Sequence, residues 1–237
     1  MNKEEIVESL ATITILFDEP LMNYTFTKTG GPADVLAFPK KQEEVKQIID
    51  YCRIHDIPWM VLGNASNLIV QDGGIRGVVI MLTEMKQIHV KGTMVIAEAG
   101  ASLIDTTYAA LAESLTGFEF ACGIPGSVGG AVYMNAGAYG GEIKDVFAEV
   151  DLLLEDGTLK TLTKDEMVFS YRHSKVQELR AIVLEARFSL QTGDYEAIKA
   201  RMDELTELRQ SKQPLEYPSC GSCLLYTSDA ADDLLCV

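Results

Sequence analysis

The densest group of glycines in this 237-residue chain lies within residues 122–142. The stretch reads CGIPGSVGGAVYMNAGAYGGE and holds seven glycines in 21 residues. Glycine allows φ > 0 and lets another group lie directly against the main chain. Main-chain N–H groups exposed in this way bind anions such as a pyrophosphate. Because apolar residues such as Val132 and Tyr139 interrupt the glycines, the stretch is typical of an ordered anion-binding cradle rather than of a flexible linker.

A second, shorter loop of small residues has the same character. Residues 63–67, GNASN, follow a predicted buried strand at 59–62, and their polar side chains can hydrogen-bond a phosphate or a ribose. The loop is not a Rossmann fingerprint or a P-loop, because both G-x-G-x-x-G and Gly-Lys-Ser/Thr are absent. Two such loops in different halves of the chain favour a ligand that lies between them.

Few other residues are candidates for chemistry. Arg172 lies in a polar segment, SYRHS at 170–174, between apolar segments. The three histidines, His55, His89 and His173, are scattered, and we assign none of them as a catalytic base. The pair Cys220 and Cys223 lacks the second Cys or His pair of a zinc site, so we predict no metal.

Composition restricts the class of protein. The chain is 47% hydrophobic and 23% charged, as expected for a soluble globular protein. A net charge of −15 argues against nucleic acid and against an anionic membrane surface as partners. Five cysteines without a framework spacing favour a reducing compartment. Because a signal peptide and an apolar run of about 20 residues are both absent, we expect a cytoplasmic protein, and we expect a monomer.

The periodicity of the apolar residues predicts strands and helices in both halves. In the first half we expect a helix at 2–16, strands at 24–28 and 35–38, a helix at 41–55, and strands at 59–62 and 77–82. In the second half we expect a hairpin at 88–90 and 94–97, a helix at 102–115, a hairpin at 147–154 and 158–162, a strand at 181–190 and a helix at 194–210. Ser102 is a predicted N-cap, and Gly117 a predicted C-cap. Each half thus places strands around one helix, which indicates the α+β class.

The two glycine-containing loops together resemble the FAD-binding domain of the vanillyl-alcohol-oxidase/PCMH type. Within that superfamily the chain resembles the UDP-N-acetylenolpyruvoylglucosamine reductases, and among them the shorter type. The resemblance also includes TFTKTGGPAD at 25–34, DGGIRGVVI at 72–80, SYRHS at 170–174 and KQPLEYPSCGS at 212–222. It implies an N-terminal helix at 1–20, two FAD-binding subdomains at 21–84 and 85–190, and the start of a substrate-binding domain at 191–222.

The resemblance also implies the cofactors, the substrate and the reaction. FAD would be bound non-covalently, since neither loop contains a histidine, and NADPH would be the hydride donor. The substrate would be UDP-N-acetylglucosamine enolpyruvate, an intermediate of peptidoglycan synthesis and so of cell-wall biogenesis, cell shape and cell division. The residues that would bind FAD are Asn64, Ala65, Ser66, Asn67, Leu68, Gly123, Ile124, Pro125, Gly126, Ser127, Gly129, Gly130, Asn135, Ala136 and Gly137.

Four further residues are candidates for acting on the substrate, and two of them match family positions. Arg172 matches the arginine that holds the carboxylate of the enolpyruvyl group, a role that suits a planar fork of donors. Ser222 matches the serine that protonates C2, which requires an aligned, water-poor site. Tyr171 and Lys212 are candidates for substrate binding, and Lys212 would contact the UDP phosphates.

The chain departs from the family after Ser222. There the family continues with a phenylalanine, a basic or polar residue and a proline, and then with a substrate-binding domain, whereas residues 223–237 read CLLYTSDAADDLLCV. We therefore expect a C-terminal truncation followed by a non-native tail, and a chain that binds FAD but is inactive or impaired as a reductase. Two alternatives remain open: a non-catalytic FAD-binding module, and a flavin oxidase of the same superfamily.

Overall fold

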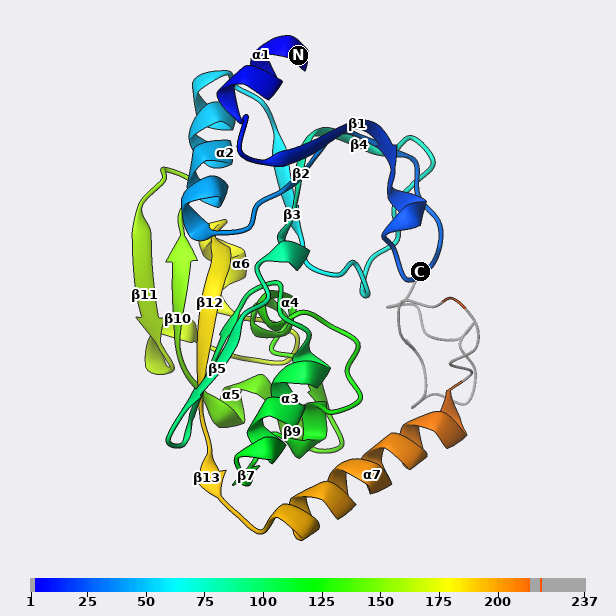
Figure 1. The fold of residues 1–237 in the computed structure, drawn as a ribbon, viewed down its shortest axis with the longest axis vertical. Coiled ribbons are helices and arrows are strands. Elements are labelled where there is room, and N and C mark those ends of the chain that lie inside the picture. Colours follow the sequence, from blue (N-terminus) through cyan, green and yellow to red (C-terminus); the bar gives the residue numbers. More distant parts are fainter. Residues whose placement is uncertain (1–2, 214–217, 219–237) are drawn as a thin grey trace.

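A computed structural model of the chain describes residues 3–213 and residue 218. Its first unit is a four-stranded sheet in the order β1-β2-β4-β3 (Figure 1). The strands are β1 (Thr14–Pro20), β2 (Pro32–Phe38), β3 (Trp59–Leu62) and β4 (Ile75–Met81). β1 is antiparallel to β2, whereas β2 and β3 both run parallel to β4.

Helix α2 (Gln42–Ile54) makes the long connection that parallel strands require. Its residues Val45, Ile48 and Ile49 are fully buried. Their spacing places them on one face of the helix, which packs into the main core. The short helix α1 (Lys3–Ser9) adds Ile6 to the same core.

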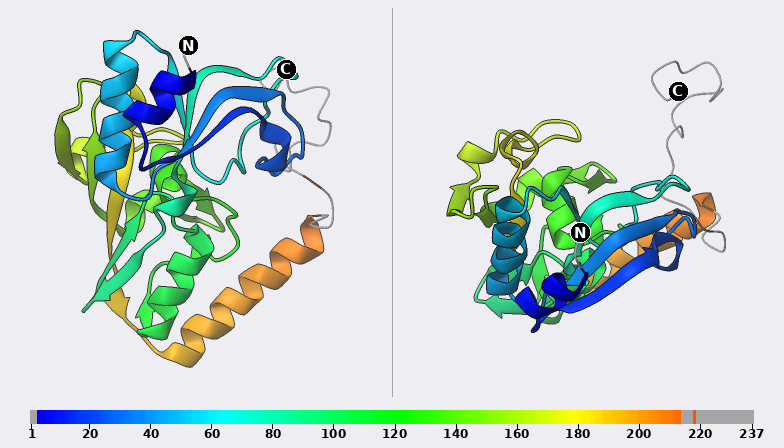
Figure 2. Two further views of the ribbon diagram at one scale, coloured as in Figure 1. Left: turned by 45° about the horizontal axis from the view of Figure 1, so that its top comes forward. Right: turned by 90° about the horizontal axis from the view of Figure 1, so that it is seen from above.

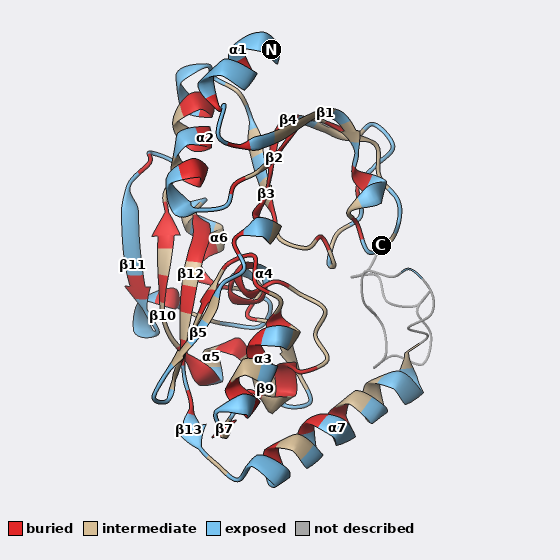
Figure 3. Ribbon diagram, viewed as in Figure 1, coloured by how far each residue is buried: buried red, intermediate tan, exposed pale blue. Residues whose placement is uncertain are grey.

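The second unit is a five-stranded antiparallel sheet in the order β11-β10-β12-β6-β5. Its strands are β5 (Ile88–Lys91), β6 (Met94–Glu98), β10 (Phe147–Leu153), β11 (Leu159–Thr163) and β12 (Ile182–Ser189). The inner strands β10 and β12 are largely buried, whereas β11 at one edge is mostly exposed (Figure 3). Helix α3 (Leu103–Ala112) follows β6, and its N-cap Ser102 accepts a hydrogen bond from the amide of Asp105 at 3.2 Å.

Short elements fill the connections. They are the 3-10 turns η1 (Leu21–Asn23), η2 (Leu82–Glu84), η3 (Glu119–Ala121) and η4 (Asp165–Met167), the helices α4 (Val128–Tyr133), α5 (Ile143–Val146) and α6 (Lys175–Leu179), and the two-residue strands β7 (Leu115–Thr116), β8 (Gly137–Ala138), β9 (Gly141–Glu142) and β13 (Gln191–Thr192). Among them, α4 is part of the glycine-rich stretch and packs against β12 of the second unit.

One hydrophobic core joins the two units, since it includes Val78 and Ile80 of β4 together with Val150 of β10 and Ala186 of β12. The last helix within the described residues, α7 (Tyr195–Lys212), runs along the outside of the second unit (Figure 2). A smaller cluster attaches it there, formed by Leu111, Cys122, Ile198, Met202 and Leu205. This cluster fixes α7 next to the start of the glycine-rich stretch.

The mixed architecture confirms the α+β prediction, and several elements lie where the sequence predicted them. These are β2, α2, the β5–β6 hairpin, α3, the β10–β11 hairpin, β12 and α7. The strands of the first sheet end at Met81 and those of the second begin at Ile88, on either side of the predicted division at 84/85.

Other predictions were wrong. The helix expected at 2–16, and with it the N-terminal helix at 1–20, ends at Ser9, and β1 begins at Thr14. The β-branched run at 12–15 explains this, because such side chains favour strands. The strand expected at 24–28 is a turn after η1, α3 ends at Ala112 well before Gly117, and α6 was not predicted.

Candidate functional site

The two loops singled out in the sequence lie in direct contact. A Cβ on Gly63 would lie only 1.9 Å from Oγ of Ser127. Next to this contact, Nδ2 of Asn64 donates a hydrogen bond to the main-chain oxygen of Pro125 at 2.9 Å. Residues 63–68 follow β3 of the first unit, and residues 123–130 lead into α4 beside the second. The expected two-loop arrangement is therefore present.

The first loop keeps its main-chain donors available. Within the described part of the chain, the amides of residues 64–68 donate to no other residue. Ala65 has a φ of +51°, which turns the chain sharply at this point, and its side chain is buried. Ser66 and Leu68 are half-buried and Asn67 is exposed. Consecutive free N–H groups in such a turn suit an anionic group.

The second loop uses most of its own amides within the protein, so only part of the anion-binding cradle predicted in residues 122–142 keeps free donors. The amides of Ile124, Gly126, Val128, Gly129 and Gly130 all donate within the protein. Val128 and Gly129 bond the oxygens of Ala101 and Ala99, and a Cβ on Gly129 would lie 2.9 Å from that of Ala99. These glycines therefore allow close packing, while among the described residues the amides of Gly123 and Ser127 keep no internal acceptor.

A cleft of about 790 Å³ opens beside this contact, between the two units. One wall is formed by Trp59, Met60 and Val61 of β3, and the other by Ala181, Ile182 and Val183 at the start of β12. Gly63, Ser127, Gly129 and Gly130 border it, and Arg53, Asp56, Glu155 and Arg180 also line it. The volume falls within the roughly 300–1,000 Å³ typical of small-molecule and cofactor sites.

The walls of this cleft were not among the candidate residues. Residues 59–62 were expected to form a buried strand, but β3 is an edge strand of its sheet and Met60 is 46% exposed. An apolar run in the sequence does not reveal whether its strand lies at the edge or in the middle of a sheet, because edge and inner strands can carry the same residues. The pairing of strands in the fold decides which strand faces a cleft. The one sequence feature that could have indicated a cleft beside β3 is the glycine-containing loop directly after it.

The C-terminal half of the glycine-rich stretch is organised by Asn135. This buried residue has a φ of +43°, and its Nδ2 donates to Oε2 of Glu142 at 2.8 Å and to the oxygen of Ser170 at 3.0 Å. Its Oδ1 accepts from the amide of Lys144 at 3.0 Å. Hydrogen bonds from Lys144 and Asn135 hold the pKa of the Glu142 carboxyl below its ordinary value. The side chain of Asn135 is thus fully engaged within the protein.

Two neighbours of Asn135 are also engaged in local structure. Ala136 donates its amide to Ala131 and accepts from Ile143, both at 2.9 Å. Gly137 pairs with Glu142 between β8 and β9, and a Cβ there would lie 2.7 Å from the oxygen of Gly141. Asn135, Ala136 and Gly137 therefore shape the segment next to Ser170 rather than offering free polar side chains to a ligand.

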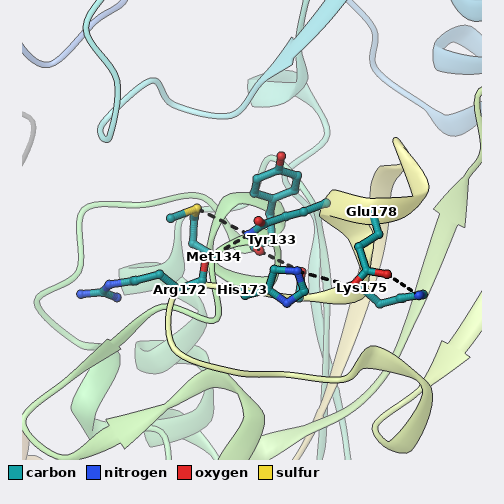
Figure 4. A network of polar contacts seen from close by, with 8 residues as sticks. Tyr133, Met134, Arg172, His173, Lys175 and Glu178 are labelled. Atoms are coloured by element: carbon teal, nitrogen blue, oxygen red, sulfur yellow. Dashed lines mark hydrogen bonds and ion pairs between the residues drawn. The ribbon is translucent and has the colours of Figure 1, made fainter. Parts of the chain in front are cut away.

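Arg172 lies at the apex of a tight turn that this network supports. Ser170 and His173 bond each other's main chains across the turn, and Arg172 has a φ of +54°. Its side chain is exposed (Figure 4). Its Cζ lies 5.4 Å from the ring centroid of Tyr171, which is itself 76% exposed. Arg172 also contributes to the lowered pKa of Glu142. The guanidinium is therefore accessible to an anionic ligand near the glycine-rich stretch.

The remaining candidates lie at or beyond the end of α7. Lys212 is the last residue of α7 and is exposed. One turn earlier, the half-buried Arg209 packs on the start of the glycine-rich stretch. A Cβ added at Gly123 would lie 3.0 Å from Cδ of Arg209. Burial lowers the pKa of this guanidinium. Ser222, Cys220, Cys223 and the predicted tail at 223–237 lie outside the described residues.

Residues 3–213 and 218 contain neither a cluster of metal-ligating side chains nor a membrane-spanning helix. In that part of the chain, no three or more His, Cys, Asp or Glu side chains come together as a metal site would require. None of the helices there is long and apolar enough to cross a membrane. Both cysteines in this part, Cys52 and Cys122, are buried free thiols.

Known proteins match most of the chain. Residues 33–163 match a family model described as an FAD binding domain. The UDP-N-acetylenolpyruvoylglucosamine reductase of Enterococcus faecalis strain V583 is 69% identical over 222 residues, which cover 94% of this chain and 74% of that protein. The enzyme of the same description from Streptococcus uberis is 57% identical over 217 residues, covering 92% of this chain and 72% of that protein.

A solved structure matches as well. The crystal structure of UDP-N-acetylenolpyruvylglucosamine reductase from Thermus caldophilus aligns with a TM-score of 0.74 at 33% sequence identity, and the alignment covers 88% of this chain and 73% of that chain. The chain therefore spans nearly three quarters of each of these three proteins.

Proposed function

The chain belongs to the UDP-N-acetylenolpyruvoylglucosamine reductases and contains an FAD-binding domain, and on this premise we propose that it reduces UDP-N-acetylglucosamine enolpyruvate to UDP-N-acetylmuramate for peptidoglycan synthesis. Beyond the sequence identity, one structural observation supports the proposal. The two glycine-containing loops meet at Gly63 and Ser127, and the cleft of about 790 Å³ opens beside them.

The residues of this site fit FAD. Residues 64–68 offer consecutive amides without internal acceptors among the described residues, as a pyrophosphate requires. Gly123 and Ser127 add two more from the facing loop. The apolar walls of the cleft, with Trp59 and Val61 opposite Ile182, suit a flat, weakly polar ring. We propose that the pyrophosphate lies between the loops and that the adenosine lies in the cleft.

Bound FAD would supply hydride transfer from a reduced nicotinamide, which we propose is NADPH, to the enolpyruvyl group of the substrate. The chain's own residues bind and orient these partners. Arg172 would form a bidentate pair with the substrate carboxylate, where negative charge grows during the reaction. Such a pair favours the transition state over the ground state, which is what accelerates a reaction.

Other residues would bind the rest of the substrate. The exposed Tyr171 ring lies beside Arg172, where it can cover the sugar nucleotide. Lys212, at the exposed end of α7, would pair with the UDP phosphates as a mobile point charge. Ser222 remains the proposed proton donor to C2. We further propose that the protein acts in the cytoplasm and as a monomer.

The test follows the flavin absorbance without oxygen. The purified chain is loaded with FAD, titrated with NADPH until the absorbance is lost, and then mixed with UDP-N-acetylglucosamine enolpyruvate. We expect NADPH to bleach the flavin, the substrate to restore its absorbance at the reduced rate of an impaired reductase, and UDP-N-acetylmuramate to form in equal amount. Arg172→Ala should leave bleaching unchanged and slow the second step by about a hundredfold or more, the usual cost of removing one stabilising donor.

The other outcomes discriminate between the alternatives. Recovery of the absorbance with oxygen alone would instead indicate an oxidase. FAD binding without either step would indicate a non-catalytic module. A chain that retains no FAD would contradict the proposed site as a whole.

A further inference from the structure

We propose that Gln177 is a positioning residue that holds Arg172 in the orientation needed to receive the substrate carboxylate. The inference rests on the proposed function for what Arg172 binds, but the contact itself is a feature of the fold. Gln177 lies in α6, an element that the sequence did not predict.

The carboxamide of Gln177 joins two segments that are distant in the sequence. Its Nε2 donates to the main-chain oxygen of Tyr133 at 2.9 Å and to that of Arg172 at 3.1 Å, and it lies 4.0 Å from Sδ of Met134 (Figure 4). Tyr133 is the last residue of α4, which begins at the contact between the two loops. One side chain therefore ties the main chain of Arg172 to the helix that borders the proposed FAD site.

Arg172 needs such a tie for two reasons. Its φ of +54° lies in the left-handed region, which is unfavourable for a residue other than glycine and persists only where neighbours enforce it. Its side chain is also exposed, so packing does not hold it. Among the described residues, Gln177 is the only side chain that donates to the oxygen of Arg172.

The two flanks of the turn are held separately. On one side Nδ2 of Asn135 donates to the oxygen of Ser170 at 3.0 Å. On the other side Oγ of the buried Ser174 donates to the oxygen of Tyr133 at 2.8 Å. Loss of the Gln177 amide therefore leaves the turn attached at both ends and releases only its apex, where Arg172 lies.

The same helix provides a matched control. Lys175 forms an ion pair with Glu178, whose Oε1 also lies 3.5 Å from Nε2 of His173 (Figure 4). In this network the amine of Lys175 does not contact the oxygens of Tyr133 or Arg172. Lys175→Ala thus removes a charged side chain from α6 without removing the tie.

The experiment compares Gln177→Ala, Gln177→Glu and Lys175→Ala with the unchanged chain, all loaded with FAD. Gln177→Glu keeps the size of the side chain but turns its donor into a carboxylate that faces two carbonyl oxygens. Both steps are followed under anaerobic conditions: bleaching by NADPH, and recovery of the absorbance with UDP-N-acetylglucosamine enolpyruvate at several concentrations. Amide hydrogen exchange of the peptide around residues 169–179 is measured on the same samples.

We expect both Gln177 variants to bleach within about twofold of the unchanged chain and to lose about tenfold or more in the recovery rate at saturating substrate, since small displacements of a reacting group cost this much or more. The half-saturating concentration should change much less than the rate. Exchange should become faster around residues 170–174 and remain unchanged in α2. Lys175→Ala should match the unchanged chain in every measurement.

Several results would overturn the inference. These are equal slowing of both steps, loss of FAD, an effect of Lys175→Ala as large as that of Gln177→Ala, or Gln177 variants that recover at the normal rate. If the unchanged chain bleaches but never recovers with the substrate, the proposed function fails instead. Hydrogen exchange then decides the positioning role: unchanged exchange around residues 170–174 in Gln177→Ala refutes it, and faster exchange confined to them supports it.

Discussion

Gly63 and Ser127 lie so close together that a Cβ on Gly63 would be 1.9 Å from the Ser127 oxygen. Gly63 directly follows β3 of the first sheet, and Ser127 is the N-cap of α4, which packs with the second. Ser127 is buried and its Oγ accepts from the amide of Gly130 at 3.3 Å. Because the contact leaves no room for a side chain, glycine at 63 is a condition for joining the two loops.

The first prediction concerns this contact. Gly63→Ala must displace Ser127 or the loop, so it should destabilise the chain by about 1–3 kcal/mol, as overpacking usually does. It should also weaken FAD retention, because the two loops move apart. Urea denaturation followed by tryptophan fluorescence measures the first effect, and the flavin content after gel filtration measures the second.

Gly73→Ala is the matched control for Gly63→Ala. Nothing lies within 4 Å of a Cβ at Gly73, and its φ is not in the left-handed region. The variant should therefore be as stable as the unchanged chain and should hold FAD equally well. Gly63→Ala that behaves like Gly73→Ala would contradict the closeness of the two loops.

A second prediction concerns Asn135. Asn135→Asp removes the two hydrogen bonds that Nδ2 donates and places a carboxylate against Glu142 and the oxygen of Ser170. We expect a loss of about 2–4 kcal/mol at neutral pH, since a buried group loses its partners and gains a repulsion. Asn135→Ala should lose somewhat less, because it adds no charge. A smaller loss for the aspartate variant, measured by urea denaturation at pH 7, would contradict this account.

A third prediction follows from the lowered pKa of Glu142. Its folded-state pKa lies below the ordinary 4.5 because Lys144 and Asn135 bond the ionised form. Its contribution to stability is therefore present above pH 4.5 and is lost as the pH falls through the folded-state value. The stability difference between the unchanged chain and Glu142→Gln should be constant near neutral pH and shrink in acid.

A fourth prediction concerns thiol reactivity. Cys52 lines the cleft but is only 1% exposed, and burial raises the pKa of its thiol to about 12. The thiolate is the reactive form, so Cys52 should resist alkylation at pH 8 until the chain unfolds. Mass spectrometry of the Cys52 peptide after brief iodoacetamide treatment, with and without urea, measures this. Extensive labelling of the folded chain would show that the α2 side of the cleft opens.

Local sequence patterns were sufficient to predict a helix where apolar residues recur at helical spacing or where a capping residue marks the start of the helix. Helix α2 has apolar residues on one face, and α7 begins after Asp194, whose carboxylate accepts from the amide of Ala197 at 2.9 Å. Such features depend on neighbours within one or two turns, so the sequence contains them. They were insufficient at 2–16, where a helical pattern and a β-branched run overlap and pairing with β2 decided in favour of a strand.

The sequence by itself determined which residue types stand at the site: small residues at 63–67, glycines throughout 122–142, and an arginine at 172. Only the tertiary structure decided which of their groups are available. Gly129 donates its amide to the oxygen of Ala99, Asn64 donates to the oxygen of Pro125, and the main-chain oxygen of Arg172 accepts from the side chain of Gln177. The reason is physical: a donor is free or engaged according to the acceptors within about 3 Å of it, and packing brings those acceptors from distant parts of the chain.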